Sequence, residues 1–290
     1  MDGVRAALAQ IAPKLGDIDA NLDLHLEWVA KAADQGARLI CFPELSLTGY
    51  HLLDQVPEVA LPTDHPTLKR LADASRRIDI VAGFVEQGAG YKFFNSAGYF
   101  SGGELCHLHR KLYLPTYGMF QEGREFAEGQ QVRHFDGPIG PTGLLICEDL
   151  WHGSVPWILA QQGAEILIVP SNSPTRGAKP DRGVTSVDVW GSLLGVTAQF
   201  QTCWVIFVNR VGSEDGLIFG GGSMAVNPFG VRVASAPALE ESLTMVDIDA
   251  GSVRRARTAY PLLRDERLDL ADREIQRIRR LRYDLPDEES

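Results

Sequence analysis

The sequence lacks the features that mark membrane, disulfide-stabilised or nucleic-acid-binding proteins. No window approaches the ~20 consecutive apolar residues of a membrane span, and the amino terminus has no charged leader followed by an apolar core. The cysteines are few and widely spaced, without a CxxC pair, which fits neither a disulfide framework nor a zinc site. Basic residues number 28 against 38 acidic ones, giving a net charge of -10 that argues against a polyanionic partner. We therefore predict a cytoplasmic protein with free thiols and no nucleic-acid partner.

Segments with strand and helix periodicity alternate along the 290 residues, of which 44% are hydrophobic and 23% charged, as in ordinary globular proteins. Strands are predicted at 4–10, 38–42, 78–85, 93–100, 104–109, 142–147, 165–169, 204–208, 223–227, 231–234 and 243–248. Helices are predicted at 18–33, 68–77, 155–162 and 184–201. The stretches 78–106 and 223–248 favour two mixed sheets over one parallel sheet. The fold class is therefore α/β, with helices covering the sheets.

Three short motifs follow predicted strands: Phe42-Pro43-Glu44-Leu45, His109-Arg110-Lys111-Leu112 and Leu145-Ile146-Cys147-Glu148-Asp149. The carboxyl edge of a sheet is where α/β proteins hold their ligands. Taken singly, Cys147 could be a buried hydrophobe, and Glu44 and Lys111 could be surface groups. Taken together, a carboxylate can accept the thiol proton, and an ammonium can stabilise both a thiolate and the oxyanion formed at a carbonyl. The set suits acyl transfer.

These three motifs, in this order, resemble the nitrilase or carbon-nitrogen hydrolase superfamily, and the similarity extends from Val4 to about Asp249. The resemblance implies an αββα sandwich that associates with other copies across a helical face. It implies Glu44 as general base, Cys147 as the nucleophile that forms a thioester, and Lys111 as stabiliser of the tetrahedral intermediate. The backbone N–H of Glu148 would assist. Glu122 matches an additional glutamate that many members use to hold lysine and substrate, although a surface glutamate in a polar loop is the alternative.

A narrower resemblance is to the glutaminase domain of glutamine-dependent NAD synthetases. It rests on KLYLPTYGMFQEGREF from Lys111, ICEDLW from Ile146, and the segment Ser171-Asn172-Ser173-Pro174. It implies that Tyr117 and Phe120 line a glutamine pocket, with Glu148, Ser171 and Ser173 as further substrate-binding candidates. Those synthetases carry a second, ATP-using domain with an SGGxDS loop, whereas only about forty residues follow Asp249 here. We therefore expect that the chain does not make NAD unaided.

Several other residues receive structural interpretations. Cys41, Cys106 and Cys203 are interpreted as core thiols rather than redox partners. His152 is close enough in sequence to Cys147 to suggest a Cys-His dyad, but the resemblance assigns the base to a carboxylate, so we favour a position at the pocket rim. The three glycines at 220–222 lack a following lysine and are interpreted as close backbone packing rather than a phosphate loop.

The leading hypothesis is a hydrolase without metal or cofactor that cleaves a carboxamide C–N bond through a Cys147 thioester and releases ammonia, with L-glutamine or a small ω-amide favoured. A nitrilase or N-carbamoyl amidase reaction stays open, since the triad does not specify the carbon attacked. Two other hypotheses are a partner subunit that supplies ammonia to, or regulates, a separate synthetase, and a thiol redox module. We predict a hydrolase domain at 1–250 and an extension at 251–290, whose Ile275, Ile278 and Leu281 contact another subunit of a homo-oligomer.

Overall fold

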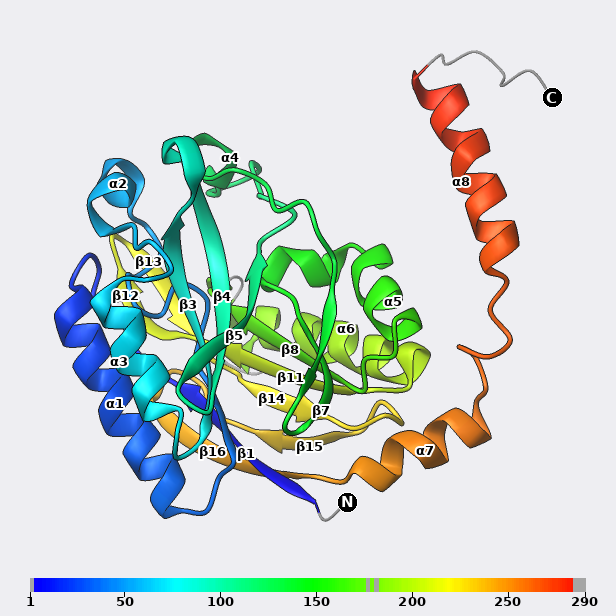
Figure 1. Cartoon of the computed structure of the whole chain (residues 1–290), viewed down its shortest axis with the longest axis horizontal. Coiled ribbons are helices and arrows are strands. Elements are labelled where there is room, and N and C mark those ends of the chain that lie inside the picture. The colour runs from blue at the N-terminus through cyan, green and yellow to red at the C-terminus, as the bar shows by residue number, and fades with distance from the viewer. Residues whose placement is uncertain (1–2, 176–177, 180–182, 284–290) are drawn as a thin grey trace.

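The computed structural model describes residues 3–175, 178–179 and 183–283, and two six-stranded mixed sheets form its centre (Figure 1). The first sheet has the order β16 (Ser242–Ile248), β1 (Val4–Gln10), β2 (Leu39–Cys41), β3 (Asp79–Gln87), β4 (Phe93–Ser101), β5 (Glu104–Arg110). The second has the order β15 (Arg232–Ser235), β14 (Met224–Val226), β11 (Trp204–Asn209), β8 (Ile166–Ser171), β7 (Gly140–Leu144), β6 (His134–Gly137). The parallel pairs β1–β2, β2–β3, β7–β8 and β8–β11 place the carboxyl ends of successive strands at common edges.

Alternating side chains build three apolar layers. Ala6, Leu8 and Cys41 of the first sheet face Ile168 and Ile206 of the second in the space between the sheets. The opposite face of the first sheet is covered by α1 (Ile18–Asp34) and α3 (Pro66–Ala74). The opposite face of the second is covered by α5 (Ser154–Gln161) and α6 (Thr185–Gln201). This period of two, buried on both faces, is the pattern expected of covered sheets, and the predicted αββα sandwich is confirmed.

Short elements connect this framework. They are the turns η1 (Leu53–Gln55), η2 (Ala89–Tyr91) and η3 (Cys147–Trp151), the helices α2 (Val56–Val59) and α4 (Glu122–Glu125), and the strand pairs β9 (Ala178–Lys179) with β10 (Gly183–Val184) and β12 (Val211–Glu214) with β13 (Leu217–Gly220). The sequence patterns missed β6 and the β12–β13 hairpin, whose residues show no sustained alternation. The strand predicted at 142–147 ends at Leu144, and Cys147 begins the turn η3 instead.

The carboxyl-terminal part contains two helices with different environments. α7 (Ala250–Ala259) packs on the body through Val253 and Ala256, which are 2% and 0% exposed, and Arg257 Nη2 donates to the Ala164 carbonyl at 2.6 Å. α8 (Leu268–Tyr283) buries none of its residues and projects away from the sandwich (Figure 1). Within the part of the chain that the structure describes, no helix combines the length and apolar character needed to cross a membrane.

Candidate active site

Glu44, Lys111 and Cys147 converge at one edge of the sandwich. Glu44 follows β2, Lys111 comes directly after β5, and Cys147 comes after β7 in the other sheet. Lys111 Nζ donates to Glu44 Oε1 at 2.6 Å and to Glu122 Oε1 at 2.7 Å. Lys111 and Glu44 are each 1% exposed. The tertiary structure thus brings a carboxylate, an ammonium and a thiol from distant parts of the sequence around one buried cluster.

Glu44 is fixed by a dense set of hydrogen bonds. Asn95 Nδ2 donates to Oε1 at 2.7 Å, and the Asn172 backbone N–H donates to Oε2 at 2.8 Å. Asn172 Nδ2 also donates to the Glu44 carbonyl at 2.7 Å. Gly83 lies directly beneath this turn, because a Cβ there would overlap the Leu45 nitrogen. The carboxylate therefore has little freedom to leave the lysine.

Cys147 adopts an unusual backbone conformation at the start of η3. Its φ of +44° lies in the left-handed region, which is uncommon for a residue with a side chain. Ser171 Oγ donates to the sulfur at 3.1 Å. Removal from bulk water and the negative charge of Glu44 raise the pKa of the Cys147 thiol well above its ordinary value, while Lys111 and Ser171 oppose that shift. The resting sulfur is therefore protonated at neutral pH and needs a base before it can attack.

Lys111 and Glu122 each affect the pKa of the other in this buried site. Burial by itself lowers the pKa of Lys111, but the charges of Glu122 and Glu44 outweigh burial and hold that pKa well above its usual value. Burial raises the pKa of Glu122 to about 7, although Lys111 opposes the rise. Glu122 Oε1 accepts from both Lys111 and the Tyr50 hydroxyl at 2.6 Å, whereas its buried Oε2 has no hydrogen-bond partner among the described residues. Lys111 is thus an ammonium, and Glu122 titrates near neutrality.

A cavity of about 280 Å³ opens onto the Cys147 sulfur. It is lined by Tyr117, Phe120, Cys147, Glu148, Trp151, Ser173, Pro174, Ser186, Val189 and Trp190. The Tyr117 hydroxyl donates to both Glu148 oxygens, at 2.9 and 3.1 Å. Ser173 Oγ accepts from Trp190 Nε1 at 2.8 Å, which leaves the Ser173 hydroxyl proton available to a ligand. The cavity therefore combines aromatic walls with a carboxylate and a hydroxyl.

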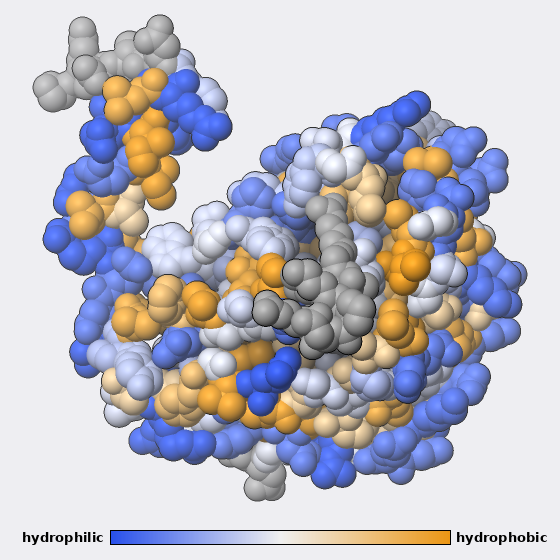
Figure 2. All heavy atoms as spheres, turned by 180° about the vertical axis from the view of Figure 1, so that it is seen from behind, coloured by the Kyte–Doolittle hydropathy of each residue, from blue (hydrophilic) through white to orange (hydrophobic). Residues whose placement is uncertain are grey.

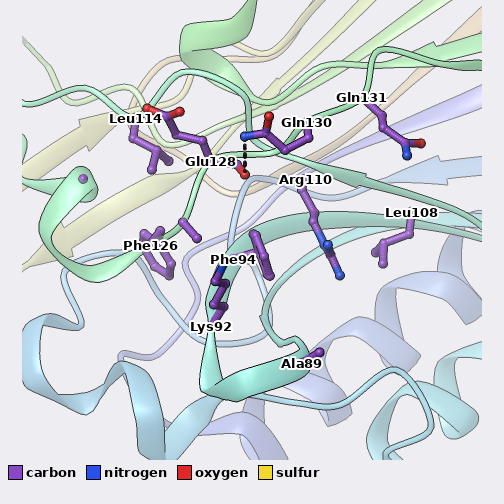
Figure 3. A pocket seen from close by; sticks show the side chains of 12 residues that line it. Ala89, Lys92, Phe94, Leu108, Arg110, Leu114, Phe126, Glu128, Gln130 and Gln131 are labelled. Carbon is purple, nitrogen blue, oxygen red and sulfur yellow. Dashed lines mark hydrogen bonds between the residues drawn. The ribbon is translucent and has the colours of Figure 1, made fainter.

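A larger hollow of about 850 Å³ lies elsewhere, over Phe94, Arg110 and Gln130 (Figure 3). Arg110 is the neighbour of Lys111 in sequence, but successive strand residues point to opposite faces. Its guanidinium lies 3.9 Å from the Phe94 ring centroid and donates to Glu86. Glu44, Lys111 and Cys147 are absent from the lining of this hollow. Cys147 lines the smaller cavity, whereas Glu44 and Lys111 line neither, so the smaller cavity is the candidate substrate site.

The structure places the remaining candidates in distinct positions. Ser171 is fully buried and contacts the sulfur rather than lining the cavity. His152 stacks flat on Tyr113, with ring centroids 3.4 Å apart, and its Nε2 lies 3.9 Å from Glu148 Oε1. Cys41 and Cys203 are buried, and burial raises the pKa of both thiols, that of Cys203 to about 12.

Cys106 is exposed, in contrast to the core position predicted for it, because it lies on β5, an edge strand. No group of three His, Cys, Asp or Glu residues that could hold a metal ion is found within the described ranges.

Sequence reasoning missed Tyr50, Asn95 and Asn172, which hold Glu44 and Glu122 in place. Asn172 lies between the candidate residues Ser171 and Ser173, and this position in the sequence is a signal that it belongs to the site. Tyr50 and Asn95 belong to no recognisable motif, and only the packing of β4 and the loop after β2 against the cluster distinguishes them. Their functional position could not be deduced from local sequence.

The geometry agrees with comparison to known proteins, since the profile of the family described as "Carbon-nitrogen hydrolase" matches residues 5–258. The chain belongs to the carbon-nitrogen hydrolase family. An (R)-stereoselective amidase from a Pseudomonas species is 33% identical over 277 residues, covering 94% of this chain and 95% of that protein. Membership of the family thus rests on nearly the whole length of the chain.

Two other relatives bear on the site. The glutamine-dependent NAD(+) synthetase of Acinetobacter baylyi is 32% identical over 86% of this chain, but the chain spans only 45% of the length of that relative. The structure of a mutant amidase from Nesterenkonia sp. AN1 superposes on this chain with a TM-score of 0.79 at 26% sequence identity. The match covers 94% of this chain and 97% of the amidase chain. In that structure, the acetamide moiety of fluoroacetamide is added covalently at the active site cysteine.

Proposed function

We propose that this protein hydrolyses the carboxamide of a small ω-amide, with L-glutamine favoured, through a thioester on Cys147. The observation that carries the proposal is the buried contact of Lys111 with both Glu44 and Glu122 beside a cavity that opens onto the Cys147 sulfur. A protonated thiol beside a fixed carboxylate is the arrangement that general-base activation of a nucleophile requires. At about 280 Å³ the cavity suits a small molecule.

In the proposed reaction Glu44 takes the proton of Cys147 as the sulfur attacks the amide carbonyl carbon. Lys111 has three N–H donors, of which Glu44 and Glu122 accept two. The third, together with the Glu148 backbone N–H at the start of η3, would stabilise the oxyanion. Proton transfer from Glu44 to the leaving nitrogen breaks the C–N bond and releases ammonia. Glu44 then takes a proton from water as the water attacks the thioester carbon. Return of that proton from Glu44 to the sulfur breaks the C–S bond, releases the carboxylic acid and regenerates the thiol.

The lining of the cavity supports a substrate that carries an ammonium group, as L-glutamine does. Glu148 presents a carboxylate there, oriented by Tyr117. Trp151 and Trp190, which also line the cavity, form an edge-to-face aromatic pair with ring centroids 5.3 Å apart. Carboxylates and aromatic faces both attract cations. A simple aliphatic amide would leave Glu148 without a charged partner and should be a poorer substrate.

The decisive experiment measures ammonia release from glutamine, asparagine, other ω-amides, N-carbamoyl amino acids and nitriles. Cys147→Ala should reduce the rate by several orders of magnitude, because no other group can form the thioester. Mass spectrometry of the acyl-protein identifies the part of the substrate that is retained. Unchanged ammonia release by the Cys147→Ala protein would refute the proposal. A preference for nitriles or carbamoyl compounds would instead select the corresponding alternative reaction.

A second candidate is a glutaminase-like subunit that supplies ammonia to a separate synthetase. The similarity to NAD synthetase relatives, of which the chain spans less than half, supports it. Size-exclusion chromatography with a candidate synthetase, and glutaminase rates with and without it, test the idea. Rapid uncoupled turnover with no association would remove it. The cytoplasmic location stays a prediction.

We also propose a homo-oligomer in which α8 contacts a second copy. Ile275, Ile278 and Leu281 are 49%, 51% and 73% exposed, and apolar residues recur among charged ones along the projecting arm (Figure 2). A helix with an apolar stripe gains stability by burying that stripe against another surface.

A further inference from the structure

The buried carboxylate of Asp149 lies two residues after the nucleophile and takes no part in the proposed reaction. Its Oδ1 accepts from the backbone N–H groups of Leu112 and Tyr113, at 2.9 and 3.1 Å. Its Oδ2 accepts from the Ile146 backbone N–H at 2.9 Å and contacts His109 Nε2 at 2.8 Å. Asp149 is 0% exposed. Both of its oxygens are therefore fully occupied within the protein.

These four contacts join the segments that carry the ammonium and the thiol. His109 is the next-to-last residue of β5, and Leu112 and Tyr113 follow Lys111 immediately. Ile146 directly precedes Cys147. β5 belongs to the first sheet, whereas the strand before Ile146, β7, belongs to the second. One carboxylate thus connects the two sheets at the point where each presents a reacting group.

Asp149 also closes the turn that presents the sulfur. Its own backbone N–H donates to the Ile146 carbonyl at 3.0 Å, while its carboxylate accepts from the Ile146 N–H. The positive φ of Cys147 between these two residues is energetically unfavourable for a residue with a side chain. A conformation of that kind persists only when surrounding contacts enforce it. The reciprocal bonds between Asp149 and Ile146 supply that enforcement.

His109 supports the carboxylate from the β5 side. An ionised carboxylate only accepts, so Nε2 of His109 carries a proton and donates it to Oδ2. The imidazole is 3% exposed, and bonds to a charged acceptor are stronger than those between neutral groups. The orientation of Asp149 therefore depends on a donor held in β5, the strand that ends directly before Lys111.

We infer that Asp149 and His109 are positioning residues that set the separation between the Lys111 ammonium and the Cys147 sulfur. The inference rests on the proposed function, since it takes these two groups as reactive. Neither residue lines the substrate cavity. We call the contacts that Asp149 makes with His109, Leu112, Tyr113 and Ile146 the Asp149 clamp. Its loss should lower kcat and leave KM near its original value, because a displacement of a reacting group by about 1 Å costs about 10²-fold in rate.

The test compares His109→Phe, which keeps a flat ring and loses the donor, with His109→Gln, which keeps an N–H. Tyr99→Phe is the matched control, because the Tyr99 hydroxyl donates to the buried carboxylate of Asp79 at 2.6 Å, away from the cavity. His109→Phe should reduce kcat by about 10²-fold, and His109→Gln should recover most of it. Tyr99→Phe should lower the melting temperature and keep kcat.

A second readout does not depend on the substrate. Iodoacetamide labelling of Cys147, followed by mass spectrometry, should be slower in His109→Phe because a displaced ammonium stabilises the thiolate less. The exposed Cys106 serves as internal reference. Wild-type kcat and labelling in His109→Phe, with only a lower melting temperature, would overturn the inference.

If His109→Phe is not recovered folded, Asp149→Asn decides by the same two measurements. Wild-type values in that variant overturn the inference, and slower turnover with slower labelling supports it. If the wild-type protein released no ammonia from any tested compound, the proposed function would be refuted. The labelling comparison would still test whether Asp149 and His109 position Lys111 relative to Cys147.

Discussion

Glu122 is a buried residue of the site whose raised pKa lies near neutral pH. Burial raises its pKa to about 7, so the folded protein holds this proton more tightly than the unfolded chain, where the ordinary value is 4.5. Lys111 and Tyr50 both donate to the same oxygen, and the other oxygen is buried without a partner among the described residues. A proton on that second oxygen relieves the cost of burying a charge. The protonation of one residue thereby becomes linked to stability.

The pH dependence of stability tests this linkage. Because the folded state binds the extra proton between pH 4.5 and about 7, the contribution of Glu122 to stability decreases as pH rises through that window. Glu122→Gln cannot ionise and should therefore lose less stability than wild type between pH 5 and pH 8. Thermal or urea unfolding at both values measures the difference. Glu125→Gln, three residues along the same short helix and 22% exposed, is the control. An identical pH effect in Glu122→Gln and wild type would contradict the assignment.

At the scale of elements, the turn after β2 depends on close packing by β3. Gly83 in β3 allows the Glu44-Leu45 peptide to approach the strand directly, since a Cβ would overlap the Leu45 nitrogen and lie 2.9 Å from the Glu44 carbonyl carbon. The Leu47 N–H donates to the Gly83 carbonyl at 3.0 Å, so the turn is also bonded to the strand. Glycine is required here for space rather than for backbone freedom.

Gly83→Ala should displace Glu44 and reduce kcat by about 10²-fold, with a loss of about 1–3 kcal/mol in stability. Gly98→Ala in the neighbouring strand β4 is the matched control, because its Cβ would meet the Leu105 and Phe100 side chains rather than the catalytic turn. That variant should be destabilised and retain its turnover. Ammonia release and thermal unfolding of both variants measure the difference. Equal kcat in the two alanine variants would show that the turn tolerates the displacement.

At the scale of the whole molecule, the two carboxyl-terminal helices should respond differently to removal. α7 packs on the sandwich, where Trp204 Nε1 of β11 donates to Oγ of the α7 residue Ser252 at 2.9 Å. A truncation that removes α7 should therefore impair folding. α8 buries nothing within one chain.

Ending the chain at Leu263 should therefore preserve the fold and the melting temperature of the monomer while lowering the mass of the oligomer. Light scattering after size exclusion measures that mass. The substitutions Ile275→Ser, Ile278→Ser and Leu281→Ser, made together in the 290-residue chain, should lower the oligomer mass in the same way without shortening the chain. An unchanged mass for both proteins would argue against a subunit contact through α8.

The sequence alone predicted the alternation of strands and helices, the glutamate, lysine and cysteine candidates and, through the family resemblance of the motifs that carry them, the αββα class. Each of these is recorded locally, in hydrophobic periodicity or in a short motif next to a strand end. Only the tertiary structure decided that β16 pairs with β1 rather than staying beside β15, that Cys147 begins a turn, and that Tyr50, Asn95 and Asp149 surround the cluster. The physical reason is that sheet pairing and buried hydrogen bonds join residues distant in sequence, and no local pattern specifies which distant partner is chosen.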